Sequence, residues 1–422
     1  MTAAEPGPTQ PVPVLVAAAG EPWESEALNL VAAARPRLVL HKRCLDLADL
    51  LATGQTGVAA VALLSSDLAG VDADSVDLLR RSGVATVLVA EGEAARWSRL
   101  GIQHVIGPEH LPQLPGVLLT AAAVVTAPPE PERQTAIDRE VPDRPSARVL
   151  AVWGPAGAPG RTTVVVNLAR ELAALGCQPF LIDADPYAGS VAQHLGVLDE
   201  VSGLLAACRR ANAGELDPAV LADLARSADG IRVLTGLPRA DRWNEVRPAA
   251  FEAVLTAGTA LASHLLLDVG FSLERDPEEE FGGRPGRNSM TLAALARADE
   301  VVVVGAADPV GLTRLARGLV ELRSASTAPL RVVVNRTRST LGWSQRDLRA
   351  MVEGFVAPLG IHFLPEDRTA CDRALMAGRP LHEGGDCALR RDLAAIAAAV
   401  GGLPAARPRR RTRRRGRRVP AG

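Results

Sequence analysis

Short runs of apolar residues alternate with segments of helical spacing along most of the chain. In the first part, the apolar runs predict strands at residues 14–18, 38–41, 58–64, 85–90 and 104–106. Strands that are apolar throughout and separated by helical patterns are typical of a parallel sheet covered on both faces. We therefore expect a doubly wound α/β domain of flavodoxin-like size over residues 13–121.

A second block with the same alternation runs from residue 148 to residue 403. Its predicted strands are residues 148–153, 179–182, 231–234, 264–267, 300–304 and 331–334. Residues 122–147 are rich in proline and charge and have no periodic apolar face, so we expect a linker there. Residues 1–12 and 404–422 have no pattern that would pack a core, and we expect both ends to be disordered.

The composition limits the classes of function. The 422 residues are 47% hydrophobic and 23% charged, which is the balance of a globular protein, and the aromatic share of 3% argues against base-stacking readers of RNA. No apolar run is long enough to span a membrane, and the N-terminus has no signal segment. The five cysteines follow no metal-binding spacing. We expect a reduced, cytoplasmic protein without a structural metal.

Charge is distributed unevenly along the chain. Residues 403–422 hold nine arginines and no acid, whereas the rest has 38 basic and 48 acidic residues, a net charge of −10. The run from Arg407 to Arg418 has three interpretations: nonspecific DNA binding, contact with an anionic membrane, or solubilisation of the chain end. Because Lys42 is the only lysine, an arginine at a motif's lysine position is consistent with the overall composition.

The segment from residue 149 to residue 176 has the layout of a phosphate-binding loop. A buried strand ends at Trp153, a loop rich in glycine, proline and alanine follows, and Thr162 opens an amphipathic helix. Backbone N–H groups and the positive end of the helix dipole then point to one place. Gly160 permits close approach, Arg161 supplies positive charge for phosphates, and the Thr162 hydroxyl can ligate Mg²⁺.

Three carboxylates strengthen the interpretation of this loop as a binding site. The loop alone also fits an ordinary capped strand–helix connection, because it departs from the strict phosphate-loop motif. Pro155 and Arg161 stand where that motif has glycine and lysine. However, Asp183 and Asp185 close one buried strand, and Asp268 closes another. The carboxyl ends of parallel strands are where such sheets bind ligands. One acid can hold Mg²⁺ through water while another orients attacking water.

The motifs occur in the order GAPGRTT, DADP, LLLDVG, VVVNR and FLPEDRTACDRAL. This order resembles the MinD/ParA family of P-loop ATPases, and most closely its branch associated with pilus assembly and septum-site placement. Members of that branch join a receiver-like N-terminal domain to the ATPase domain. The resemblance implies an ATP- and Mg²⁺-binding homodimer that acts at the membrane or nucleoid. Its protein partner would belong to pilus, secretion, septum or chromosome-partition machinery.

The resemblance also implies which residues form the site. The phosphate loop comprises Gly157, Gly160, Arg161, Thr162 and Thr163. The adenine pocket comprises Asn335, Arg336, Pro365 and Asp367. The Mg²⁺ site, partly through water, comprises Thr162, Asp183 and Asp268, and the catalytic residues are Asp185 and Arg161.

The loop departs from the family pattern at several positions. Ala156 stands where the family has a lysine that reaches a phosphate across the dimer, Pro159 removes one N–H donor, and Arg161 is bulkier than lysine. We expect nucleotide binding to persist and hydrolysis to be slow or lost. The alternative is an interaction scaffold with a relict ATPase fold. A sequence-specific DNA regulator is disfavoured, because no helix-turn-helix signal is found.

The first domain lacks the pattern of a phosphorylatable receiver. Such a domain needs acids after its first strand, an aspartate after its third and a lysine after its fifth. Here Asp67 lies some residues beyond the end of the predicted third strand, and Glu21 is its only candidate partner. No lysine follows the fifth strand. We expect a pseudo-receiver used for docking or localisation.

Overall fold

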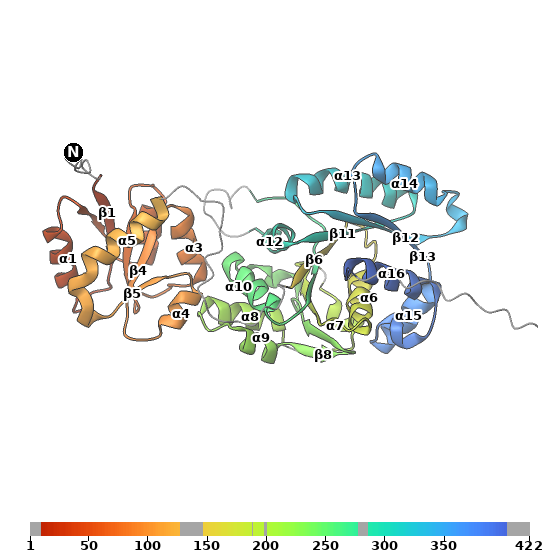
Figure 1. Cartoon of the computed structure of the whole chain (residues 1–422), viewed down its shortest axis with the longest axis horizontal. Helices are drawn as coiled ribbons and strands as arrows, with labels where there is room; N and C mark the ends of the chain where they lie inside the picture. Colours follow the sequence, from red (N-terminus) through yellow and green to blue (C-terminus); the bar gives the residue numbers. More distant parts are fainter. Residues whose placement is uncertain (1–9, 127–146, 188, 198–200, 277–285, 403–422) are drawn as a thin grey trace, which may run out of the picture.

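The computed structural model describes residues 10–126, 147–187, 189–197, 201–276 and 286–402. Within these residues the chain forms two α/β domains that lie side by side (Figure 1). The run from Arg407 to Arg418, the N-terminal end and most of the expected linker lie outside the described residues, so the expectations for them stay predictions. No helix within the described ranges is both long and apolar enough to cross a membrane.

The first domain is built on a parallel sheet of the order β2-β1-β3-β4-β5. The strands are β1 (Val12–Ala17), β2 (Leu38–Arg43), β3 (Val61–Ser65), β4 (Ala85–Val89) and β5 (His104–Ile106). The helices are α1 (Glu24–Ala33), α2 (Leu47–Gly54), α3 (Ala73–Arg81), α4 (Ala94–Arg99) and α5 (Leu114–Thr126), with η1 (Pro108–Gln113) before the last. This strand order is the flavodoxin-like one, so the expected fold class is confirmed.

Helices cover both faces of this first sheet. Alternate residues of β1 explain how: Val14 and Val16 pack with α1 and α5, whereas Leu15 and Ala17 pack with α2, α3 and α4. Side chains on the two sides of a strand alternate, so a strand buried on both faces reads as a continuous apolar run. Helix α5 includes residues 122–126, which the sequence pattern assigns to the linker.

The second domain contains an eight-stranded sheet of the order β13-β12-β11-β6-β10-β7-β9-β8. Its strands are β6 (Arg148–Trp153), β7 (Pro179–Ala184), β8 (Arg226–Ala228), β9 (Ile231–Leu234), β10 (His264–Val269), β11 (Glu300–Ala306), β12 (Leu330–Thr337) and β13 (Gly360–Pro365). All neighbours pair in parallel except β8, which runs antiparallel to β9 at one edge. The doubly wound parallel architecture is therefore confirmed, with one antiparallel strand added.

The helices of the second domain also lie on both faces of its sheet. They are α6 (Arg161–Ala174), α7 (Val191–His194), α8 (Gly203–Asn212), α9 (Pro218–Leu224), α10 (Pro248–Thr259), α12 (Ser289–Arg297), α13 (Pro309–Ala325), α14 (Gln345–Glu353), α15 (Arg368–Ala377) and α16 (Ala388–Val400). Three short 3-10 turns are η2 (Ala240–Glu245), η3 (Ser339–Leu341) and η4 (Leu381–Gly384). Helices α6 and α16 share one core layer, whereas α8, α10, α12 and α13 share the other.

The two domains contact each other through α3 and α4 on one side and the α8–α10 region on the other (Figure 1). Arg96 Nε donates to the carbonyl of Ala213 (2.9 Å), and Arg99 Nη1 donates to the carbonyl of Gly214 (3.2 Å). Asp74 accepts a bond from the backbone N–H of Ala249 (3.2 Å). These polar contacts fix the first domain against one end of the second.

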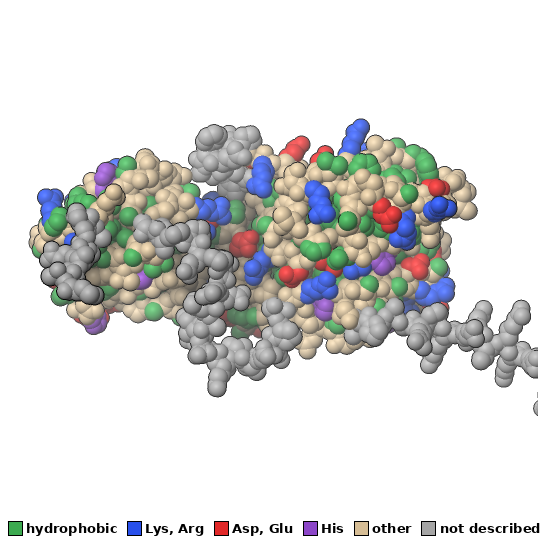
Figure 2. All heavy atoms as spheres, turned by 45° about the horizontal axis from the view of Figure 1, so that its top comes forward, with side chains coloured by type: hydrophobic (Ala, Val, Ile, Leu, Met, Phe, Trp, Pro, Cys, Tyr) green, Lys and Arg blue, Asp and Glu red, His purple; other side chains and the backbone are tan. Residues whose placement is uncertain are grey.

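The exposed face turned toward the reader in Figure 2 carries mixed charge over the second domain. Basic and acidic side chains are interspersed there, with apolar side chains scattered between them (Figure 2). The fields of interspersed charges of opposite sign partly cancel, and salt screens what remains over a Debye length of about 8–10 Å. This face therefore differs from the arginine run, where the sequence concentrates one sign.

Candidate functional site

The phosphate loop lies between β6 and α6, at the centre of the second sheet. Gly157 and Gly160 have φ angles of +106° and +101°, a region that side chains rarely adopt. A Cβ at Gly154 would lie 2.2 Å from the carbonyl oxygen of Val304, so this position needs glycine for a different reason, the close approach of β11. The loop is therefore shaped by glycines at three positions.

Asn335, at the end of β12, holds this loop in place. Its side-chain amide donates a 2.7 Å hydrogen bond to the carbonyl of Pro159, and its oxygen accepts one of 2.8 Å from the backbone N–H of Arg336. A Cβ at Gly160 would lie 2.5 Å from the same amide nitrogen. Asn335 thus braces the loop; its role at an adenine stays a prediction.

The carboxylates named from the sequence converge beside the loop. Asp183 and Asp268 are register partners at the ends of β7 and β10. The Thr162 hydroxyl, in the first turn of α6, donates to Asp268 Oδ2 over 2.6 Å, and Ser190 Oγ lies 3.4 Å from Thr162 Oγ1. The arrangement brings together the three residues that the resemblance implied for Mg²⁺.

Burial makes these acids costly to ionise. Burial, and next the charge of Asp268, raise the pKa of Asp183 well above its usual value. Burial also raises the pKa of Asp268, although the Thr162 hydrogen bond and the charge of Arg161 lower it in part. A cation between them would offset this unfavourable electrostatics.

The oxygen atoms at this site suit Mg²⁺ as ligands. Asp268 Oδ1 is buried and has no hydrogen-bond partner among the described residues. The available ligands are all oxygen atoms, which Mg²⁺ prefers over nitrogen or sulfur, and this ion usually keeps several waters with one or two carboxylates. A cage of three or more metal-binding side chains is not found within the described part of the chain. The geometry therefore suits an ion that keeps several of its water ligands.

The two residues expected to be catalytic pair with each other. Arg161 Nη2 lies 3.1 Å from Asp185 Oδ2, and its Nη1 donates to the carbonyl of Gly154 over 3.0 Å. The Arg161 side chain is only 11% exposed. Asp185 Oδ1 in turn accepts from the backbone N–H of Tyr187 (2.9 Å). Both catalytic candidates are thus engaged inside the protein in this structure.

The remaining predicted positions spread along the same edge. Arg336 lines a small cavity beside the loop. Asp367 caps α15 by accepting from the backbone N–H of Ala370 (3.0 Å), and Pro365 ends β13 in register with Thr337. The carbonyl of Thr163 accepts a bond from the Asn167 side chain (2.7 Å).

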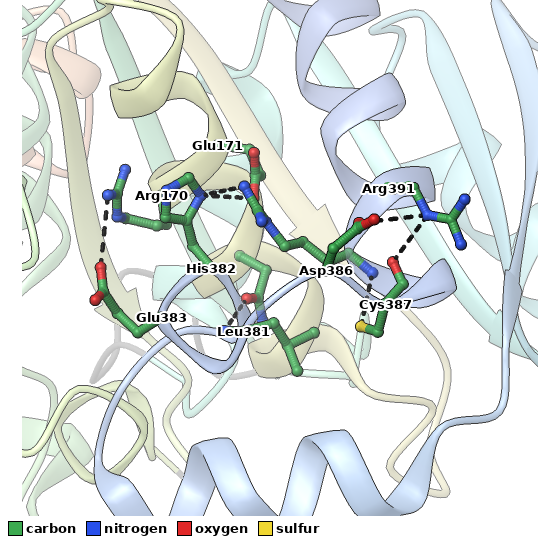
Figure 3. Close-up of polar contacts among 10 residues, drawn as sticks. Arg170, Glu171, Leu381, His382, Glu383, Asp386, Cys387 and Arg391 are labelled. Carbon is green, nitrogen blue, oxygen red and sulfur yellow. Dashed lines mark hydrogen bonds and ion pairs between the residues drawn. The ribbon is translucent and has the colours of Figure 1, made fainter. Parts of the chain in front are cut away.

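A larger cavity of about 480 Å³ lies away from the loop, among α15, η4 and the start of α16. Figure 3 shows polar contacts beside this cavity, where Glu171 of α6 lies near His382. Arg390 Nε also donates to Glu171 Oε1 over 3.0 Å. Asn167, one turn earlier on the same helix, accepts from the backbone N–H of Leu381 (2.8 Å). The helix that begins at the phosphate loop therefore also anchors the wall of this cavity.

Sequence reasoning missed two polar residues at the loop. Ser190 approaches Thr162, as given above, and follows the DADP segment by only a few residues. Arg314 of α13 donates to the carbonyl of Ala156 over 3.4 Å. No motif marks Arg314, because it comes from a helix 158 positions away along the chain.

Comparison with known proteins gave results at the level of structure alone. No protein-family model matches the chain, and a search of curated proteins gave no significant match. The MinD cell division ATPase from Pyrococcus furiosus is similar over 61% of this chain and 100% of its own, at 21% identity and a TM-score of 0.48. A ParA family ATPase from Chlorobium tepidum is similar over 60% of this chain and 99% of its own, at 14% identity and a TM-score of 0.49. An ATP complex of McdA from Cyanothece is similar over 61% of this chain and 98% of its own, at 20% identity and a TM-score of 0.47.

Proposed function

We propose that this chain binds Mg²⁺ and ATP at the loop between β6 and α6. The observation that carries the proposal is the meeting of Thr162 and Asp268 over 2.6 Å beside a loop of glycines with positive φ. Backbone N–H groups at the start of α6 would receive the phosphates. Asp183, buried at the neighbouring strand end, would share the ion's outer shell.

Each residue then has a defined task. The Thr162 hydroxyl would ligate Mg²⁺ and the Asp268 carboxylate would orient it. The ion, when bound, would neutralise charge on the phosphate oxygens. Arg161 would turn from Gly154 toward the phosphates, and Asp185 would then be released to position a water molecule. Because that release requires breaking a buried ion pair, turnover is expected to be slow.

The proposal is tested by calorimetric titration of ATP into the full-length protein, once with Mg²⁺ and once with EDTA. We expect binding that depends on Mg²⁺ and that Thr162→Val weakens strongly. Thr162→Ser keeps the hydroxyl and serves as the matched control, which should bind like the wild type. Lack of binding at millimolar ATP would contradict the proposal.

A scaffold without turnover is the second candidate function. It is favoured by Ala156, by the lost N–H donor at Pro159 and by the closed pair of Arg161 and Asp185. Phosphate release distinguishes the two candidates. Release above background that disappears in Asp185→Ala supports an ATPase, whereas equal background in both proteins supports the scaffold.

At the cellular level, we propose a dimeric spatial organiser of pilus, secretion, septum or chromosome-partition machinery. The motif order from the phosphate loop to FLPEDRTACDRAL supports this role. We infer that the protein is cytoplasmic and that it meets the membrane or nucleoid at its periphery. Sedimentation of the full-length protein with and without Mg·ATP tests the dimer. A monomer in both conditions would contradict it.

A further inference from the structure

An arginine from a distant helix rests directly on the phosphate loop. Arg314 lies in the second turn of α13, and its Nη1 atom is the one that donates to the carbonyl of Ala156. The same atom would lie 2.1 Å from a Cβ at Gly157. The guanidinium therefore occupies the space into which a side chain at position 157 would project.

In the part of the chain that the structure describes, the acidic groups near Arg314 do not neutralise its guanidinium, so its charge is available to an anionic ligand. A cavity of about 50 Å³ opens at this contact, lined in part by Ala156, Gly157, Arg314 and Arg336. Asp308 also lines it, but its carboxylate caps α13 by accepting from the backbone N–H of Gly311 (2.9 Å). Within the described ranges, no carboxylate forms an ion pair with Arg314, and its side chain is exposed.

The other cation of the loop is placed differently. Arg161 is buried and already matched by Asp185 and by the carbonyl of Gly154. Ala156 ends in a methyl group and offers no charge to a phosphate. A polyphosphate carries several negative charges, and charge-assisted hydrogen bonds from a guanidinium to phosphate oxygens are stronger than neutral ones.

We propose that Arg314 supplies the charge that Ala156 lacks and contacts the terminal phosphate of a nucleotide bound at this loop. The inference rests on the proposed function and adds to it a phosphate-binding residue from outside the motifs. A guanidinium can bind a phosphate through two parallel N–H bonds. Gly157 leaves the room for the guanidinium to approach.

The test compares Mg·ATP and AMP affinities of the full-length wild type with those of Arg314→Ala. We expect Arg314→Ala to weaken Mg·ATP binding about 10- to 100-fold, the loss of one charge-assisted contact, and to change AMP binding little. Because a lysine at position 156 is expected to reach the phosphate across the proposed dimer, the double variant Arg314→Ala with Ala156→Lys should regain most of the ATP affinity at protein concentrations at which the dimer forms. Arg323→Ala, an exposed change at the far end of the same helix, is the matched control and should bind like the wild type.

The outcomes separate this inference from the proposed function. Equal ATP affinity in wild type and Arg314→Ala overturns the role of Arg314 and leaves ATP binding intact. A parallel loss for ATP and AMP without rescue by Ala156→Lys shows that Arg314 only braces the loop, which also overturns it. A wild type that binds no ATP overturns both proposals together.

Discussion

Thr162 and Asp268 are joined by a hydrogen bond of 2.6 Å, while the second oxygen of the Asp268 carboxylate is buried without a partner among the described residues. The bond links the first turn of α6 to the end of β10. A buried carboxylate with an unmatched oxygen costs stability unless a cation joins it. The Thr162–Asp268 pair therefore lowers the stability of the protein without a bound cation, and it would bind the cation when one is present.

The first prediction follows from this carboxylate. Asp268→Asn keeps the shape and removes the buried charge, so we expect it to raise the free energy of unfolding without Mg²⁺ by about 1–3 kcal/mol. The same change should weaken Mg²⁺-dependent ATP binding at least tenfold. Chemical denaturation and calorimetry measure the two effects. Asp46→Asn, which alters an exposed cap of α2, is the control and should change neither. A destabilised Asp268→Asn protein would refute this account of the site.

The second prediction concerns the contact between the domains. A Cβ at Gly214 would lie 2.7 Å from the carbonyl oxygen of Arg96, whereas a Cβ at Gly176 would meet nothing within 4 Å. Both glycines have positive φ, +69° and +86°, so both alanine variants should lose about 1 kcal/mol through backbone strain. Only Gly214→Ala should separate the domains, which small-angle scattering would detect as a larger radius of gyration. An unchanged radius in Gly214→Ala would show that the contact does not hold them together.

The third prediction is a dependence of stability on pH. Burial, followed by the charges of Arg331 and Arg349, lowers the pKa of His362 to about 4. Its Nε2 lies 3.2 Å from Nη1 of Arg331, so the neutral ring can accept a hydrogen bond there. The unfolded chain takes up this proton near pH 6.5 and the folded one only near pH 4. Stability should therefore fall as the pH falls through this window.

The expected loss between pH 7 and pH 4.5 is about 1–3 kcal/mol, after discounting for solvent near the ring. Unfolding of wild type and His362→Gln at several pH values measures it, since the variant should lose much of this slope. His110→Gln, at an exposed position, is the matched control and should retain the wild-type slope. Identical slopes in all three proteins would exclude His362 as the cause.

The fourth prediction addresses the arginine run. If Arg407 to Arg418 contact DNA, the logarithm of the affinity should fall with the logarithm of the salt concentration by about 0.9 per phosphate neutralised. Deletion of residues 404–422 should then abolish DNA binding and leave nucleotide affinity unchanged. Fluorescence anisotropy with full-length and truncated protein at two salt concentrations measures this. Equal, salt-insensitive binding by both would show that the arginines are not the contact.

Much of the fold could be predicted because the strands are apolar on both sides. Residues 104–106, 148–153 and 231–234 were predicted with the bounds that the structure has. Strands β8 and β13 were missed for physical reasons. The first has three residues, two of them polar and exposed, and the second is interrupted by Gly360, His362 and Pro365 at the edge of the sheet. Edge strands need no continuous apolar run.

The site was predictable where it depends on strand ends, and not where it depends on packing between distant helices. Asp183 and Asp268 come together because neighbouring parallel strands end at one edge. The closed pair of Arg161 and Asp185 depends on side-chain conformation, which spacing does not reveal. Arg314 reaches the loop only because α13 packs beside β11, and nothing in its local sequence marks that approach.

The anchoring of α6 has a consequence for the order in which the protein folds. Asn167 and Glu171 reach their partners Leu381 and Arg390 across 214 and 219 positions of the chain. Contacts between such distant positions form late, because a long loop must close first. During synthesis, the helix behind the phosphate loop therefore lacks its packing partner until α16 has left the ribosome. The nucleotide site should therefore mature only after α16 has been made, and a chain that stops before residue 381 would carry every phosphate-loop residue on a helix α6 that lacks these two anchors.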